Sequence, residues 1–268
     1  MRIALGLTAA LGALVLAGGV GAVPDAKKPK PQAKENAAKK TVCAGTVSGV
    51  VAGDLVVPQG SSCNASGAVV RRRVYVNRNA TLTTDGAFSV GRGIDVARGA
   101  TLQVVGTQIA IAGHVRAHGA KKVALIREPR AASSGVVGGT VMLSKTEDIS
   151  VLSLTIGGGV RVHGGGGEGV EVGANRIFLS LDVMGARMLR PRQPRVFSIH
   201  SNVVSRHVRV LGNNATGASS PLFVGGNRLL RGHLTCRRNV PAPVNSGPGG
   251  TEPNVVRHGA KRGQCASL

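Results

Sequence analysis

Short stretches of alternating apolar and polar residues, separated by glycine and asparagine, recur along the chain from about residue 42. The segment 73–82 aligns with 93–102, and the same shift applied once more reaches 113–120. A weaker copy, 53–60, precedes them. Period-two apolar runs of this length predict strands, and the small-residue breaks predict turns. A fixed period of roughly 20 residues, built from such strands, predicts a β-solenoid.

The repeat predicts an all-β, single-stranded, right-handed parallel β-helix over residues 42–240, with about nine coils of roughly 20–24 residues each. The strand positions predict a core of small aliphatic side chains, such as Val74, Val76, Ile94, Val96 and Val115. Beyond about residue 125 the period loosens, although short apolar strands still recur. We therefore expect coils of unequal length in the second half, with loops between them.

The four cysteines are Cys43, Cys63, Cys236 and Cys265, and no two of them form a Cys-x-x-Cys pair. This spacing does not favour a zinc or redox site, and in an exported chain it predicts two disulfides. Cys43 and Cys63 are one repeat apart, so in a solenoid they would lie on neighbouring coils about 4.8 Å apart. That separation suits a disulfide. Cys236 and Cys265 then pair by elimination and pin the C-terminal tail.

The N-terminal end has the features of an export signal. Met1 and Arg2 precede an uncharged run that extends to Gly21, and small residues allow cleavage after Ala22. We expect a signal peptide over residues 1–22 and a secreted or cell-surface location. The alternative is an uncleaved anchor, because the run could just span a bilayer. No second long apolar run follows, so we expect no transmembrane segment in the mature chain. Lysines and prolines predict a basic, disordered linker over 23–41.

The C-terminal sequence contains Cys-x-x-Asn-x-Pro-x-Pro over residues 236–243, Asn-Val-Val at 254–256 and Gly-Gln-Cys at 263–265. Together with the repeats, these elements resemble a group of exported bacterial right-handed β-helix proteins of uncharacterised function. The resemblance covers roughly residues 42–268 and is weakest over 125–200. It implies a single β-helix with a disulfide-pinned C-terminal tail, here 241–268. It implies no activity, and no functional residue carries over from it.

The chain is strongly basic, with a formal net charge of +22, and it has one Tyr, four Phe and no Trp. So few aromatic residues disfavour a stacking platform for single-stranded nucleic acid or a conventional sugar-binding module. The basic residues recur in phase with the repeat, Arg78, Arg98 and His118 in one column and Arg72 and Arg92 in another. Stacked like charges repel, and a polyanion would relieve the repulsion. We expect an anionic cell-envelope polymer as partner, and non-specific nucleic-acid binding through charge alone.

Catalytic chemistry has weak support in the sequence. The acids beyond the linker are scattered, and residues adjacent on a strand, such as Glu147 and Asp148, point to opposite faces. His163 begins a Gly-rich stretch without a nucleophile elbow, which favours a flexible loop. His114 and His118 have a helical metal spacing but lie in a predicted strand and turn. We therefore predict no catalytic residue, no metal and no cofactor.

The resulting prediction is a monomeric, non-catalytic secreted or cell-surface β-solenoid that binds anionic envelope or extracellular polymers through stacked arginines. A carbohydrate-active enzyme of the β-helix type, resembling polysaccharide lyases or hydrolases, is the alternative. It would require carboxylates that converge in a groove. A self-assembling scaffold is a third possibility and would require an uncovered, apolar terminal coil.

Overall fold

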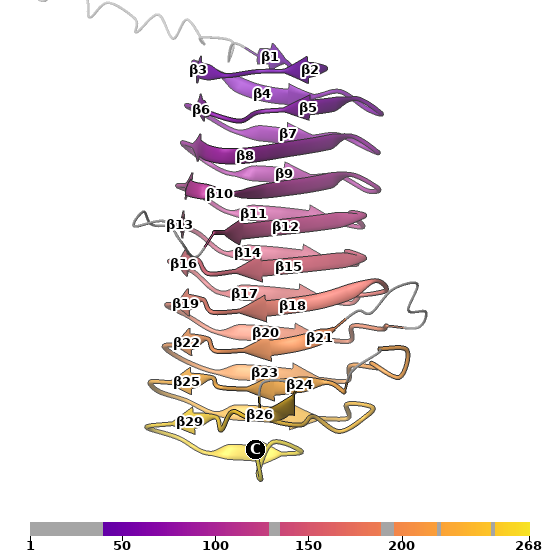
Figure 1. Ribbon diagram of the computed structural model, residues 1–268, viewed down its shortest axis with the longest axis vertical. Helices are drawn as coiled ribbons and strands as arrows, with labels where there is room; N and C mark the ends of the chain where they lie inside the picture. Colours follow the sequence, from indigo (N-terminus) through magenta and orange to yellow (C-terminus); the bar gives the residue numbers. More distant parts are fainter. Residues whose placement is uncertain (1–39, 129–134, 189–195, 219–220, 248–249) are drawn as a thin grey trace, which may run out of the picture. The chain divides into compact units, whose positions relative to one another are not determined.

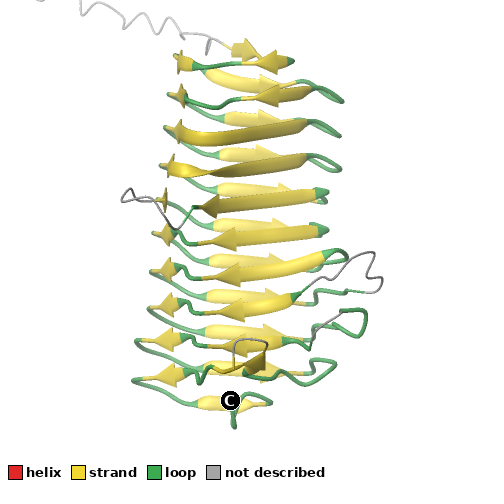
Figure 2. Cartoon of the chain, in the orientation of Figure 1, coloured by secondary structure: helices red, strands yellow, loops and turns green. Residues whose placement is uncertain are grey.

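The computed structural model describes residues 40–128, 135–188, 196–218, 221–247 and 250–268. The predicted signal peptide and nearly all of the predicted linker lie outside the described residues. Within them the chain forms strands and turns, and every strand belongs to one compact unit, Ala37–Leu268 (Figure 2). No helix in these ranges is long and apolar enough to cross a membrane.

Each coil contributes one strand to a long, all-parallel sheet, here called sheet A, which has eleven strands in the described part of the chain. Its strands are β1 (Lys40–Val42), β4 (Asp54–Val57), β7 (Val74–Val76), β9 (Ile94–Val96), β11 (Val115–His118), β14 (Val141–Ser144), β17 (Val160–His163), β20 (Leu181–Met184), β23 (Val208–Leu211), β26 (Leu234–Arg237) and β30 (Lys261–Gly263). Val74 pairs with Ile94 and Ile94 with Val115, one coil further on each time. The predicted parallel β-solenoid is confirmed.

The rest of each coil forms two further parallel ladders, here called ladder B and ladder C. Ladder B contains β2 (Gly45–Thr46), β5 (Ser62–Asn64), β8 (Thr81–Val90), β10 (Thr101–Ile111), β12 (Lys122–Arg127), β15 (Asp148–Leu152), β18 (Gly169–Gly173), β21 (Phe197–His200) and β24 (Phe223–Gly225). Ladder C contains β3 (Gly49–Val51), β6 (Ala68–Val70), β13 (Gly135–Val137), β16 (Thr155–Ile156), β19 (Arg176–Ile177), β22 (Val203–Val204), β25 (Arg228–Leu229) and β29 (Val255–Val256). The long strands β8 and β10 run through both ladders. A short antiparallel pair, β27 (Ser246–Gly247) with β28 (Gly250–Thr251), lies outside the ladders.

The hand of the coil can be followed in Figure 1. The more distant strands of sheet A run to the right and the nearer strands of ladder B run to the left, while the chain descends from β1 to the C-terminus. The coils therefore wind in a right-handed sense, which is the hand that crossovers between parallel strands strongly prefer.

Coil length changes along the solenoid. At the N-terminal end, Cys43 and Cys63 lie on neighbouring coils and are separated by 20 residues. Further on, His114 and Thr140 are in contact across neighbouring coils at a separation of 26 residues, and Asp182 and Arg209 at 27 residues. The predicted coil length of roughly 20–24 residues therefore suits the coils up to Val115 and those between Val141 and Leu181. The coil from Val115 to Val141 and the coils after Leu181 are longer. The ladders also continue past residue 240, the boundary expected from the sequence, because β29 pairs with β25 and β30 with β26.

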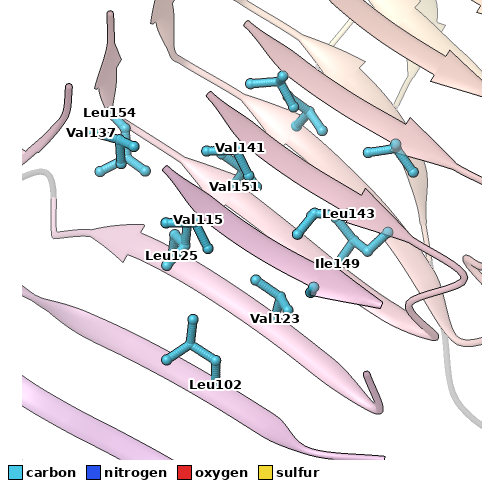
Figure 3. Packing of buried hydrophobic residues seen from close by; sticks show 14 of the residues in the cluster. Leu102, Val115, Val123, Leu125, Val137, Val141, Leu143, Ile149, Val151 and Leu154 are labelled. Carbon is cyan, nitrogen blue, oxygen red and sulfur yellow. The ribbon is translucent and has the colours of Figure 1, made fainter. Parts of the chain in front are cut away.

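The core fills the space enclosed by sheet A and the two ladders. All five core residues predicted from the repeat are buried. Figure 3 shows aliphatic side chains of sheet A, such as Val115 and Val141, facing Leu125 and Val151 of ladder B. Burial of such side chains is the main source of stability here, because each short strand makes few contacts within its own coil.

Two disulfides close the ends of the solenoid. Cys43 is bonded to Cys63, with Cα atoms 5.6 Å apart, and Cys236 is bonded to Cys265, with Cα atoms 5.1 Å apart. Both pairings agree with the prediction from the repeat spacing.

Two columns of amide side chains, buried except for the half-buried Gln264, run through the C-terminal coils and were not predicted from the sequence. The first column is Asn175, Asn202, Asn227 and Asn254, and the second is Asn213, Asn239 and Gln264. In each column a side-chain amide donates to the amide oxygen one coil further on, at 2.9–3.1 Å. The regular recurrence of these residues, once per coil, is visible in the sequence.

Candidate functional site

The first predicted basic column lies where the chain leaves sheet A for ladder B, here called the exit turn. Arg78 and Arg98 occupy successive exit turns, and the Asn79 N–H donates to the Arg98 carbonyl at 3.1 Å. The strand register places Gly119 in line with Arg98 on the next coil, so His118, at the end of β11, lies one residue before the column and level with Ala97. The side chains of Arg78, Arg98 and His118 are all exposed. A Cβ at Gly119 would lie 3.3 Å from Cγ of Arg98. The Arg98 side chain therefore extends over Gly119 of the next coil.

The second predicted column lies in the turn by which the chain enters sheet A, here called the entry turn. The Arg92 N–H donates to the Arg72 carbonyl at 3.0 Å, so these two residues are stacked as expected. Their surroundings differ, however. Arg72 is half-buried and its Nε lies 3.8 Å from Oδ1 of Asp54, whereas Arg92 is exposed and has no ion pair with a described residue. Of these two arginines, only Arg92 has no acidic partner among the described residues.

Between the two columns, the outward side chains of sheet A form a line with one residue per coil. Tyr75, Asp95, Arg116, Met142 and Arg161 are successive partners in the strand register. They line a shallow groove of about 470 Å³, with His118 and His163 on its exit side. Neither Arg116 nor Arg161 forms an ion pair with a residue in the described ranges. This line was not predicted from the sequence, because no residue type recurs in it on successive coils.

A smaller groove of about 250 Å³ opens on the entry side. It is lined by Arg73, Arg92 and His114 and shares Asp95 and Arg116 with the larger groove. Asp95 is held in place by Arg73, whose Nη1 donates to Oδ2 at 3.1 Å. The basic residues of the two grooves and of the two turn columns make up what we call the basic face: Arg72, Arg73, Arg78, Arg92, Arg98, His114, Arg116, His118, Arg161 and His163. Among the described residues, Asp95 is the one acid that lines the two grooves.

The histidines do not gather around a metal position. His114 immediately precedes β11 and His118 is its last residue, so their spacing of four falls along an extended strand and has no coordinating geometry. Nδ1 of His114 accepts a hydrogen bond from the Thr140 N–H at 2.9 Å, which leaves Nε2 to carry the proton of the neutral ring. Among the described residues no group of three or more His, Cys, Asp or Glu side chains could hold a metal ion.

The glycine stretch after His163 is an exit turn. Gly164, Gly165 and Gly166 all have positive φ, and the next element is a strand, β18. A Cβ at Gly165 would collide with the backbone of Thr146 on the preceding coil. The glycines therefore serve close approach between coils. The expected loop is held in the ladder by the Gly166 N–H, which donates to the Thr146 carbonyl at 2.7 Å.

One cluster on ladder B has the residue types of a nucleophilic site. Nδ1 of His200 lies 3.4 Å from the Ser201 Oγ and its Nε2 lies 3.6 Å from Oε1 of Glu171. The Ser201 Oγ is also 3.5 Å from the Glu252 carboxylate. The N–H groups of Ser201 and Gly226 both donate to carbonyls, so they are not available to stabilise an oxyanion. A second carboxylate beside the serine would also oppose negative charge there, and we assign no reaction to this cluster.

The arrangement as a whole defines a parallel β-helix that carries a basic, grooved face on sheet A. Comparison of the chain with protein-family models, curated proteins and solved structures finds no match. The geometry and charge of this face are therefore the features that indicate a function.

Proposed function

We propose that this chain is a non-catalytic, exported β-solenoid, secreted or held at the cell surface, that binds anionic envelope or extracellular polymers through the basic face. The observation that carries the proposal is a set of basic residues on one face that have no ion pair with a described residue: Arg92 on the entry side, Arg116 and Arg161 in the centre, and Arg78 and Arg98 on the exit side. Arg78 and Arg98 lie on successive coils, and Arg116 and Arg161 lie two coils apart. The resemblance to exported bacterial β-helix proteins supports the location.

The physical reason is electrostatic. Coils are spaced about 4.8 Å apart, so guanidinium groups on successive coils repel one another unless an anion lies between them. Asp54 and Asp95 neutralise Arg72 and Arg73 but leave the others uncompensated. A linear polyanion would neutralise several coils at once and release its own counter-ions. The guanidinium fork also matches phosphate, sulfate and carboxylate oxygens.

Binding of the oxidised chain over residues 23–268 to a panel of anionic polymers, across a salt titration, tests the proposal. The panel comprises a poly(glycerol phosphate), an acidic glycan and duplex DNA. The variant Arg78→Gln/Arg98→Gln should bind its preferred polymer several-fold more weakly. Its log–log salt dependence should be shallower by roughly two, because about one counter-ion is released for each arginine contact.

The matched control is Arg228→Gln/Arg231→Gln, which removes the same charge from two exposed arginines of the C-terminal coils. It should change the affinity less than twofold if the basic face is the binding surface. Equal losses in the two double variants would mean that binding follows net charge alone, and the proposal would then be wrong.

A further inference from the structure

We propose that the groove over sheet A is a binding site for an acidic glycan that carries a carboxylate on every second sugar residue. This inference rests on the proposed function and names the polymer class. The juxtaposition that carries it is a repeated pair, Arg116 with His118 on β11 and Arg161 with His163 on β17, separated by Met142 and Ser144 on β14. The remainder of the groove supplies an aromatic ring and one oriented carboxylate.

The repeated pair forms two equivalent carboxylate subsites. In each strand the arginine and the histidine are two residues apart, so both side chains point outward on the same face. Register pairs Arg116 with Met142 and Met142 with Arg161, and pairs His118 with Ser144 and Ser144 with His163. Each subsite offers a guanidinium fork and an imidazole N–H to one carboxylate. The intervening coil offers a thioether and a hydroxyl, which suit an uncharged sugar.

The spacing of the subsites fits an alternating polymer. Arg116 and Arg161 are two coils apart, so their backbone positions are separated by roughly 10 Å. One coil spacing is close to the length of one extended pyranose residue, so two coils correspond to one disaccharide. A chain that lies along the solenoid axis would present its carboxylates to both pairs if they recur once per disaccharide. A polymer with a carboxylate on every sugar would place one of these carboxylates over Met142, which offers no positive charge.

The N-terminal end of the groove distinguishes a glycan from a phosphate polymer. Tyr75 precedes the two subsites along the same line and lines the groove with its ring. Aromatic rings pack well against the apolar face of a sugar, whereas a poly(glycerol phosphate) chain has no ring to stack. Asp95 lies next, and because Arg73 holds its Oδ2, the other carboxylate oxygen can accept a hydrogen bond from a sugar hydroxyl. The same carboxylate would repel a phosphate group in this position.

The amino-acid composition supplies a direct probe of the groove. Tyr75 is the only tyrosine of the chain, which has no tryptophan, so its fluorescence reports the occupancy of this groove alone. We would titrate the oxidised 23–268 chain with a hexasaccharide of alternating uronate and N-acetylhexosamine. The same hexasaccharide with reduced carboxyl groups and an inorganic polyphosphate of equal charge serve as comparisons. Calorimetry gives the affinities.

The uronate hexasaccharide should change the tyrosine fluorescence and bind at least tenfold more tightly than its carboxyl-reduced form. Arg116→Gln and Arg161→Gln should each weaken binding by about tenfold or more, because each loses one charge-assisted pair. Tyr75→Ala should weaken calorimetric binding of the hexasaccharide without affecting polyphosphate binding. Arg228→Gln, outside the groove, is the matched control and should leave the hexasaccharide affinity unchanged. Circular dichroism of each variant checks that it is folded.

Three results would overturn the inference. If polyphosphate changes the tyrosine fluorescence as strongly as the uronate hexasaccharide does, the groove selects charge and not an acidic glycan. If the panel polymers bind with the expected dependence on Arg78 and Arg98 while the hexasaccharide leaves Tyr75 unaffected, the glycan assignment fails and the proposed function stands. If no anionic polymer binds, both fail.

Discussion

The N-terminal and C-terminal coils solve the same structural problem, the turn from sheet A into ladder B, in different ways. Both place a residue with positive φ at the turn, Gly99 in one half and Arg238 in the other. In the N-terminal coil the next residue, Ala100, donates its N–H back to the Ala97 carbonyl at 3.2 Å. In the C-terminal coil the next residue, Asn239, donates its N–H to Oε1 of Gln264 on the following coil at 2.9 Å.

The second corner, between ladders B and C, shows a related contrast. Phe88 and Ile109 occupy the N-terminal part of the column, within long strands. Asn202 occupies the C-terminal part of the same column, where the strands are interrupted. In the N-terminal turns, a backbone N–H donates to a carbonyl of the same turn, so the hydrogen bond lies within one coil. An amide column makes each coil depend on the next, so the C-terminal coils should tolerate corner substitutions poorly.

The largest expected effect is in the middle of the first amide column. The Asn202 side chain accepts from the Asn175 N–H and its side-chain amide and donates to the Val172 carbonyl and to Asn227. Asn202→Ala removes these bonds and leaves buried polar groups unpaired, which should lower the free energy of unfolding by about 3–5 kcal/mol. Urea unfolding followed by circular dichroism measures the loss.

Two further variants separate the lost hydrogen bonds from the lost volume. Asn202→Leu restores the volume but not the bonds, and it should be nearly as unstable as the alanine variant. Val203→Ala, at the neighbouring half-buried position that faces outward on ladder C, should lower stability by less than about 1 kcal/mol. Wild-type stability of the leucine variant would show that the column fills space and does not stabilise the corner.

The reciprocal substitution brings an amide into an N-terminal corner. Ala100 is buried, and Ala80 and Ala120 occupy the same position of the exit turn on the two neighbouring coils. The Ala80 N–H already donates to the Asn77 carbonyl. The side chain introduced by Ala100→Asn would therefore find no free donor on the preceding coil. We expect a loss of about 2 kcal/mol in the free energy of unfolding, measured by the same urea titration. A gain in stability would instead mean that the two kinds of corner are interchangeable.

The sequence predicts the fold because the N-terminal coils have the shortest turns. Where the exit turn is a tight turn closed on Ala80 or Ala100, the coil length stays nearly constant and the repeat is visible. In the coil from Val115 to Val141 and in the coils after Leu181, extra residues enter the turns without disturbing the strand register, so these coils lengthen while the ladders remain in phase. The amide columns could nonetheless have been predicted from the sequence, because Asn175, Asn202 and Asn227 recur at separations of 27 and 25 residues even where the strands differ.

The candidate site was predicted only in part, for a related reason. Arg78, Arg98 and Arg92 lie inside the regular repeat, so their stacking follows from the period. The line from Tyr75 to Arg161 crosses the irregular coil between Val115 and Val141, and only the strand register aligns its members. The ion pair between Arg72 and Asp54 was not predicted, because the separation of the two residues is not the repeat length. It depends on the burial of the Asp54 side chain, which the sequence pattern does not show.

The smallest expected effect concerns the outward line of sheet A, where the two halves also differ. Arg116 in the groove has no acidic partner among the described residues, whereas Arg209 donates from Nε and Nη2 to the 3%-exposed Asp182 carboxylate at 2.6 and 2.7 Å. Those hydrogen bonds are the main reason that the pKa of Arg209 is raised above its usual value. Arg209→Lys loses the fork geometry and should lower the free energy of unfolding by about 1 kcal/mol, while Arg116→Lys should leave it unchanged.

The pH dependence of this difference has a defined sign. A group whose pKa is raised by folding contributes its full stability below its unfolded pKa and loses that contribution only as the pH rises through the folded value. For Arg209 both values lie far above neutrality, so the difference between wild type and Arg209→Lys should stay constant from about pH 6 to 9. Urea titrations at several pH values measure it. A difference that disappears within this range would show that the Asp182 pair does not stabilise the C-terminal coils, and that both arginines are merely solvated charges on one sheet.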